Sequence, residues 1–286
     1  MNLSIDHLHN AYKDRSLTPA KLVEDILQRC QQFEEHNIWI HLLSREELQP
    51  YLDNLQGKNI DELPLYGIPF AIKDNIDLAG IETTAACPVF TNVPDKSAFV
   101  VEQLIRAGAI PIGKTNMDQF ATGLVGTRSP EPWGACRNAF DTKYISGGSS
   151  SGSAVSVALG LASFSLGTDT AGSGRVPASF NNLVGLKPSK GLLSMSGVVP
   201  ACRSLDCVSI FALTTDDANS VLQQAAIYDV DDQYARANPF DNNGRQYGLA
   251  EGKFSFAVPR PEQLNFFGNA SAQVLFEKSI TEMEAI

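Results

Sequence analysis

The sequence predicts an α/β protein in which helices cover a mainly buried sheet. From Leu65 onward, short apolar segments alternate with helical patterns and glycine-rich turns. These segments are apolar along their whole length, as 68–72 shows, which is typical of strands buried on both faces. The chain has 286 residues, 43% of them hydrophobic, enough to bury such a core in one large domain or two ordinary ones.

Residues 1–60 precede this pattern and are expected to be helical. Thr18 is a helix N-cap, and Pro19 occupies the first helical position. Apolar residues then repeat at helical spacing over 22–27, and a second helix is expected over 45–55. No chemistry is assigned to this N-terminal region.

The elements that follow alternate in type, which predicts the layered α/β architecture. First come a strand over 68–72, a helix over 98–107 and a strand over 109–112. The later elements are a helix over 154–162, a strand over 164–167, a loop over 168–175 that opens a short helix, a strand over 184–186, a polar loop from Asp229 to Gly252, and a helix over 270–286 with no stop signal.

One motif suggests a different protein class. Gly108-Ala-Ile-Pro-Ile-Gly-Lys-Thr115 matches the phosphate-loop pattern G-x-x-x-x-G-K-T. A phosphate-binding loop needs a strand before its first glycine, whereas here a helix precedes Gly108 and the intervening residues form a strand. We therefore expect Gly108 to end the helix in a left-handed conformation, and we expect no nucleotide site.

Composition excludes several function classes. A formal net charge of −10 argues against nucleic-acid binding, which needs clustered Lys and Arg, and favours a small substrate. Residues 2–14 lack the pattern of a secretory leader, and the apolar run over 153–166 is too short to span a membrane. An odd set of scattered cysteines indicates free thiols in a reducing, cytoplasmic compartment: Cys30, Cys87, Cys136, Cys202 and Cys207.

The histidines argue against two common hydrolase types. All of them fall in the helical N-terminal region, away from every serine-rich or cysteine-bearing motif, and no Cys/His ligand cluster exists. A Ser-His-Asp hydrolase or a zinc hydrolase would need a histidine in the site. The set is expected to be structural: His7, His9, His36 and His41.

A lysine can replace histidine as a general base if it is neutral. Lys73 ends the apolar strand 68–72, so its ammonium would enter an apolar interior that lowers its pKa. The alternative is an ion pair with Asp74 or Asp77 at the strand end, and on Lys73 alone this alternative is the commoner case.

Two serine-bearing turns are candidates for a nucleophile site. Gly-Gly-Ser149-Ser-Ser-Gly lies between a strand and an apolar helix, so it is a tight turn in the core rather than a flexible linker. The loop 170–173 places Ser173 among small residues after a strand, where successive N–H groups can converge on an oxyanion. A plain turn with a capping serine explains Ser173 equally well in isolation.

Together, three motifs closely resemble the amidase signature family. They are Gly-Ile-Pro-Phe-Ala-Ile-Lys73-Asp-Asn, Ser-Gly-Gly-Ser149-Ser-Ser-Gly-Ser and Gly-Thr-Asp-Thr-Ala-Gly-Ser173-Gly-Arg, within a resemblance that covers 65–218. The resemblance implies that Ser173 is the nucleophile, Ser149 the proton-relaying serine after a cis peptide bond, and Lys73 the base.

The same resemblance implies the rest of the site and the fold. The backbone N–H groups of Thr170, Ala171, Gly172 and Ser173 would form the oxyanion hole. The family fold is a three-layer α/β/α sandwich with a large mixed central sheet. We expect a single amidase domain over 1–286, with the C-terminal part of the family domain missing, and neither a cofactor nor a metal.

Within the family, three segments are most similar in sequence to the allophanate hydrolases: 115–130, 176–188 and 197–211. This resemblance implies hydrolysis of allophanate, the carboxylated urea made by urea carboxylase, to ammonia and carbon dioxide. It implies a small anionic amide substrate and a functional link to urea carboxylase. We expect neither a nucleic-acid partner nor a membrane partner, and a homodimer is compatible with this resemblance. A related amidase, an inactive truncated fragment and a glutamyl-tRNA amidotransferase A-like subunit remain as alternatives.

An anionic substrate calls for a cation in the site. Arg175, Arg128 and Arg203 are candidates by sequence position. Arg175 is expected instead to pair with Asp169 and brace the oxyanion loop, because Arg–carboxylate pairs commonly hold such turns. Asp169, Arg175 and Gly123 are therefore counted as supporting or substrate-binding residues.

Overall fold

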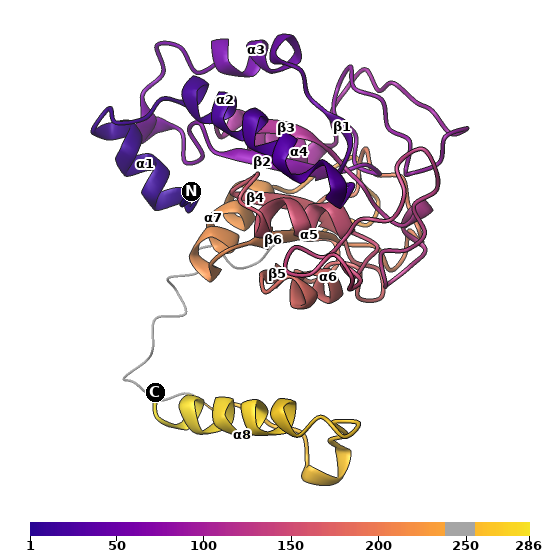
Figure 1. The fold of residues 1–286 in the computed structure, drawn as a ribbon. Coiled ribbons are helices and arrows are strands. Elements are labelled where there is room, and N and C mark those ends of the chain that lie inside the picture. The colour runs from indigo at the N-terminus through magenta and orange to yellow at the C-terminus, as the bar shows by residue number, and fades with distance from the viewer. Residues whose placement is uncertain (238–254) are drawn as a thin grey trace. The chain divides into compact units, whose positions relative to one another are not determined.

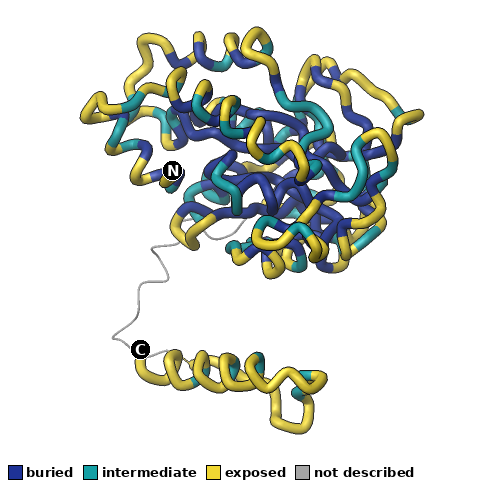
Figure 2. The backbone as a smooth tube through the Cα atoms, viewed as in Figure 1, coloured by how far each residue is buried: buried dark blue, intermediate teal, exposed yellow. Residues whose placement is uncertain are grey.

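The computed structural model describes residues 1–237 and 255–286. The chain divides into two compact units, Met1–Asn243 and Gly244–Ile286. The first unit contains the sheet, and the second contains η5 (Pro261–Gln263) and α8 (Ala270–Glu284) (Figure 1). Helix α8 is the predicted C-terminal helix, and none of its residues is buried (Figure 2). Part of the polar segment predicted after Asp229 lies outside the described residues.

The first unit is organised by a mixed sheet of six strands in the order β1-β3-β2-β4-β6-β5. Strand β2 runs parallel to β3 and β4, and the other neighbouring pairs are antiparallel. The strands are β1 (Trp39–Leu42), β2 (Pro69–Lys73), β3 (Ile110–Thr115), β4 (Phe164–Thr168), β5 (Val184–Leu186) and β6 (Val208–Ala212). The mixed sheet of the predicted α/β fold is confirmed.

Helices cover both faces of this sheet. On one face, Ala71 of β2 packs in a cluster with Ala154 and Val157 of α5 (Ser151–Ala158). On the other face, Phe70 and Ile72 join a larger cluster, because successive strand side chains point to opposite faces. That cluster includes residues of α4 (Phe99–Arg106) and α7 (Thr215–Ala225), so the strands form the middle layer. Every residue of β2, β3, β4 and β6 is buried (Figure 2).

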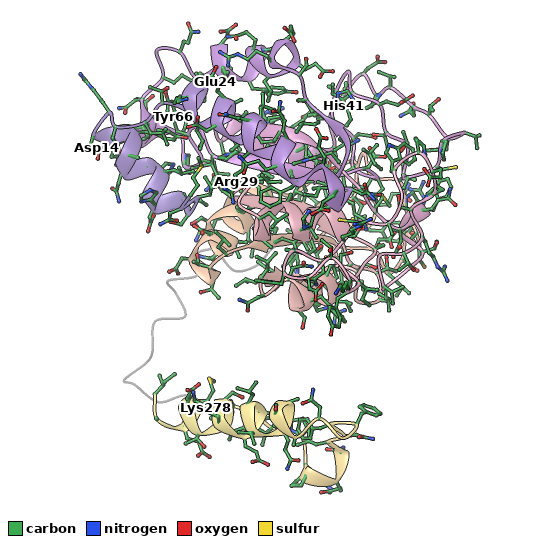
Figure 3. All side chains as sticks on the ribbon, in the orientation of Figure 1. Asp14, Glu24, Arg29, His41, Tyr66 and Lys278 are labelled. Carbon is green, nitrogen blue, oxygen red and sulfur yellow. The ribbon has the colours of Figure 1, made fainter. Side chains whose placement is uncertain are left out.

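The N-terminal region contains the predicted helices. Thr18 caps α2 (Pro19–Cys30) by accepting from the Lys21 N–H, and Ser44 forms a capping box with Glu47. Arg29, labelled in Figure 3, ties α2 to the turn after α5 by donating two hydrogen bonds to the Leu159 carbonyl. The helical elements here are α1 (Ile5–Lys13), α2, η1 (Gln31–His36), α3 (Arg45–Asp53) and η2 (Ile60–Glu62).

The expectation that residues 1–60 are wholly helical is wrong at β1. Strand β1 pairs antiparallel with β3, with Trp39 opposite Thr115. The chain turns into it at Asn37, which adopts a left-handed conformation with φ of 53°. The aromatic and β-branched residues of this short segment fit a strand, but its pairing partner lies more than 70 positions later in the chain.

The phosphate-loop motif is part of the sheet rather than a cradle. Gly108 follows α4 with φ of 99°, as expected for a residue that ends a helix. Gly113 and Lys114 lie inside β3, and the Lys114 side chain is fully buried. This segment therefore cannot wrap a phosphate. Among the described helices, none combines the length and apolar character needed to cross a bilayer.

Candidate active site

Lys73 lies at the carboxyl end of β2, on the face that α5 covers. Its side chain is fully buried, and its Nζ donates a hydrogen bond to Ser149 Oγ and another to Thr168 Oγ1, each at 2.7 Å. Ser149 precedes α5, and Thr168 ends β4, which pairs with β2. Three elements thus meet at one amine.

The Lys73 amine is poorly solvated and has no carboxylate partner. Burial lowers its pKa to about 7, although Asp118, Asp169 and Asp206 oppose that shift from a distance. No carboxylate of the described residues lies within ion-pair distance of Lys73, and Asp74 pairs instead with Lys114 at 3.2 Å. The strand-end ion pair is therefore the wrong interpretation of Lys73, because Asp74 points to the opposite face of the sheet.

Ser149 lies in a tight turn at which the chain passes close to Asp118 and Gly126. The Gly148–Ser149 peptide is cis, as expected. The Ser149 side chain is fully buried, and its carbonyl accepts from the Asp118 N–H at 3.0 Å. A Cβ at Gly148 would collide with the Asp118 carboxylate and with Gly126, so this close approach requires glycine.

Ser173 lies in the loop between β4 and α6 (Arg175–Phe180). Ser173 is 3% exposed, and its Oγ donates a hydrogen bond to the Gly123 carbonyl at 3.3 Å. The Ser150 N–H reaches the Ser173 carbonyl at 3.4 Å, which joins this loop to the turn that carries Ser149. The structure therefore brings the predicted Lys73, Ser149 and Ser173 into neighbouring segments of one site.

The backbone N–H groups of the oxyanion loop divide into two sets. Within the part of the chain that the structure describes, those of Thr170, Ala171 and Ser173 donate no hydrogen bond. The Gly172 N–H donates to Asp169 Oδ1 at 2.8 Å. Of the four predicted oxyanion-hole donors, the Gly172 N–H is therefore already used inside the loop.

Asp169 and Arg175 brace this loop as expected. Arg175 donates from Nε and Nη2 to the two Asp169 oxygens at 2.9 and 3.0 Å. Burial by itself would raise the pKa of Asp169, but hydrogen bonds from Arg175 and the Gly174 N–H hold it below its usual range. Arg175 is thus engaged in the loop rather than free for a substrate.

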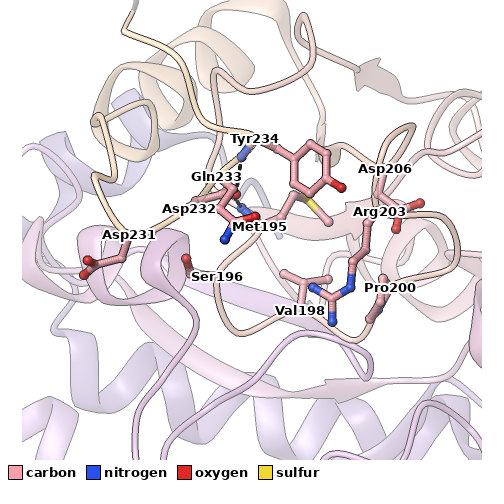
Figure 4. Close-up of a pocket in the computed structure, with 10 residues that line it drawn as sticks. All are labelled: Met195, Ser196, Val198, Pro200, Arg203, Asp206, Asp231, Asp232, Gln233 and Tyr234. Atoms are coloured by element: carbon pink, nitrogen blue, oxygen red, sulfur yellow. Dashed lines mark hydrogen bonds between the residues drawn. The ribbon is translucent and has the colours of Figure 1, made fainter.

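Ser173 lines a cavity of about 530 Å³. Gly123, Arg128, Thr170 and Cys202 are among its other lining residues. The exposed Arg203 lines a different cavity of about 390 Å³, where the close-up shows it beside Val198 and Pro200 (Figure 4). Arg203 thus lies in another cavity, and Arg175 is paired with Asp169. Of the three candidate arginines, Arg128 is the one that lines the Ser173 cavity without pairing with Asp169.

Sequence reasoning missed three buried residues that support the site. Thr168 is the second acceptor of Lys73. Asp118 accepts from the Gly126 and Arg128 N–H groups, and Asp206 accepts from the Thr170 hydroxyl at 2.5 Å. An acid close to the end of an apolar strand is a detectable signal, but the partners of Asp118 and Asp206 lie in loops that only the fold brings together.

The histidines take no part in this site. The Nε2 atom of His41, which is labelled in Figure 3, lies 3.1 Å from the Glu47 carboxylate. Burial lowers the pKa values of His9 and His36. In residues 1–237 and 255–286, no cluster of three or more His, Cys, Asp or Glu is arranged to hold a metal ion.

Comparison with known proteins agrees with this geometry. The sequence model of the family described as Amidase matches residues 21–286. The chain is 48% identical over 270 residues to the urea amidolyase of Saccharomyces cerevisiae. The aligned region covers 94% of this chain and 14% of that relative. The chain is 36% identical over 293 residues to the A-type subunit of the glutamyl-tRNA(Gln) amidotransferase of Exiguobacterium sibiricum, covering 99% of this chain and 58% of that one.

Solved structures show the same relationship. Allophanate hydrolase of Kluyveromyces lactis superposes with a TM-score of 0.76 at 50% identity, over 82% of this chain and 39% of that chain. The chain thus spans less than two thirds of the length of each of these relatives. With most of its length matched by the family model and its three motifs gathered in one site, the chain belongs to the amidase family.

Proposed function

We propose that this chain carries the catalytic site of an amidohydrolase that hydrolyses allophanate to ammonia and carbon dioxide in urea degradation. The carrying observation is the buried Lys73 amine, 2.7 Å from Ser149 Oγ, with Ser173 in the adjoining cavity. The similarity to an allophanate hydrolase at 50% identity supports the substrate. We also propose that 1–286 is part of one amidase domain.

The proposed reaction begins with proton transfer from Ser173. The Ser173 hydroxyl turns from Gly123 toward Ser149, and its Oγ attacks the terminal amide carbonyl. Its proton passes to Ser149, while the Ser149 proton passes to neutral Lys73. A pKa of about 7 suits this role, because a base tuned near the working pH can both accept and return a proton.

The oxyanion formed by this attack needs hydrogen-bond donors that are already in place. We assign this role to the N–H groups of Thr170, Ala171 and Ser173, which donate to no other described group. Lys73 then returns the proton through Ser149, and the C–N bond breaks to release ammonia. Water attacks the acyl-enzyme by the same relay and releases a nitrogen that carries two carboxyl groups. This product loses one carbon dioxide to leave carbamate, which decomposes to the second ammonia and the second carbon dioxide.

The substrate and its source follow from the same proposal. Allophanate is anionic, and Arg128 lines the cavity beside Ser173, where it would face the substrate carboxylate. Because allophanate is a carboxylated urea, an enzyme of the urea carboxylase type must supply it. The five free cysteines support a cytoplasmic site of action. The homodimer stays a prediction.

Ammonia release by the purified chain tests the proposed function. We expect release from allophanate that exceeds release from glutamine and from simple amides, and that is abolished in Ser173→Ala. Ser151→Ala is the matched control, since its buried hydroxyl donates to the Asn116 carbonyl and lies outside the relay. Turnover of glutamine alone would favour a glutamyl-tRNA amidotransferase A-like activity. Absence of both turnover and Ser173 labelling would indicate an inactive fragment.

A further inference from the structure

The structure buries two lysines on neighbouring strands and points them to opposite faces of the sheet. Lys73 shares the α5 face with Ala71, whereas Lys114 of β3 lies beside Ile72 in the register. Because laterally paired residues share a face, Lys114 lies on the face of Ile72 and Asp74. Both lysine side chains are fully buried, so each needs a partner or must lose its proton.

Lys114 meets this need with a carboxylate. Its Nζ lies 3.2 Å from Asp74 Oδ1 and donates to Thr83 Oγ1 at 2.9 Å and to the Glu82 carbonyl at 3.3 Å. The other Asp74 oxygen accepts from the Thr84 N–H at 2.9 Å and from its hydroxyl at 2.5 Å. On the face away from Lys73, Asp74 Oδ2 is thus hydrogen-bonded to Thr84, and the buried Oδ1 has the Lys114 ion pair but no hydrogen bond.

The acids that face each lysine differ. Lys114 has Asp74, Asp77 and Glu82 around it, and these oppose the lowering of its pKa by burial. Lys73 has hydroxyl partners only. The acids that face it from other elements are each held by other donors: Asp118 by the Gly126 and Arg128 N–H groups, Asp169 by Arg175, and Asp206 by the Thr170 hydroxyl.

Asp74 is the acid that immediately follows Lys73 in the chain, and Lys114 is the cation that neutralises it. We propose that Lys114 is a positioning residue, which neutralises the Asp74 carboxylate on the far face of the sheet and so keeps that buried charge from stabilising the Lys73 ammonium. This inference rests on the proposed role of Lys73 as the base. Without Lys114, an uncompensated buried carboxylate next to Lys73 would favour its ammonium form.

Direct titration of Lys73 tests this inference without depending on turnover. The full chain is produced with 13Cε-labelled lysine, and the Lys73 resonance is assigned by its loss in Lys73→Met. We expect Lys73 to titrate near 7 in the wild type, and about one pH unit higher in Lys114→Met. Lys114→Gln loses the charge but keeps a side-chain N–H donor, so it gives the same test with a polar side chain at this position.

The double variant Lys114→Met/Asp74→Asn separates charge from packing. It lacks both members of the ion pair, and we expect its Lys73 pKa to return close to the wild-type value. An unchanged Lys73 pKa in Lys114→Met and Lys114→Gln would overturn the inference while leaving the base assignment intact. An equal rise in the single and double variants would also overturn it, since it would show a packing effect. Titration of wild-type Lys73 near 10.5 would instead contradict the proposed base.

Discussion

Lys73 Nζ and Thr168 Oγ1 are joined by a hydrogen bond of 2.7 Å inside the sheet, between the ends of two parallel strands. A neutral amine has two N–H donors and one lone pair. In the structure Nζ also donates to Ser149 Oγ. In the neutral amine this hydrogen bond would reverse: one N–H stays directed to Thr168, and the lone pair faces the Ser149 hydroxyl, from which it would take a proton. Thr168 thereby orients the proposed base.

Loss of the Thr168 hydroxyl should slow the reaction of Ser173. We expect Thr168→Val to lower the rate of labelling by a fluorophosphonate probe roughly fivefold, because one hydrogen bond of about 1 kcal/mol orients the amine. Thr168→Ser keeps the acceptor and should react at close to the wild-type rate. Equal rates in Thr168→Val and wild type would show that Thr168 does not orient Lys73.

The labelling rate should depend on pH through Lys73. Neutral lysine is the reactive form, so the wild-type rate should rise through a midpoint of about pH 7 and level off above it. Lys73→Met should lose this midpoint, with its largest deficit above pH 7. Measurement of the rate from pH 5.5 to 9 checks this; a flat wild-type profile would exclude Lys73 as the titrating group.

The buried Lys73 should also cost stability at neutral pH. Its pKa is about 7 in the folded chain and 10.5 in a solvated lysine, so between these values the unfolded chain binds more protons and stability rises with pH. Relative to Lys73→Met, the wild-type free energy of unfolding should therefore gain on the order of 4 kcal/mol between pH 7 and 10.5.

Urea unfolding of both proteins at several pH values measures this difference. At pH 7, Lys73→Met should be the more stable protein, although the unpaired Ser149 and Thr168 hydroxyls offset part of the gain. The free energy of unfolding of the wild type minus that of Lys73→Met should rise with pH. A fall of this difference with pH would contradict a buried, deprotonated lysine.

The Arg175–Asp169 pair should matter more for the loop than for global stability. The Arg175 side chain is 56% exposed, so we expect Arg175→Met to lower the free energy of unfolding by only about 1 kcal/mol. The fluorophosphonate labelling rate should fall by a larger factor, because Asp169 also holds the Gly172 and Gly174 N–H groups. Arg175→Lys keeps the charge but loses the two-pronged geometry, so its labelling rate should lie between those of the wild type and Arg175→Met. A labelling rate in Arg175→Met equal to that of the wild type would show that Arg175 does not brace the loop.

Much of the fold was predictable because its signals are local. The Thr18 cap and Pro19 predicted the start of α2, and the apolar segment near 184–186 predicted β5. Strand β1 was not predictable, because a four-residue segment becomes a strand only through its pairing with β3. Likewise, the free N–H groups of Thr170 and Ala171 and the engaged one of Gly172 depend on how Asp169 folds back over its own loop.

The sequence by itself determined the buried strands, the absence of histidine from the serine motifs, and the three motifs that carry Lys73, Ser149 and Ser173. These follow from composition, spacing and local backbone preference. Only the tertiary structure decided that Lys73 pairs with hydroxyls and Asp74 with Lys114. The reason is that adjacent side chains on a strand face opposite sides of the sheet, so their partners are set by the neighbouring strands and not by the next residue.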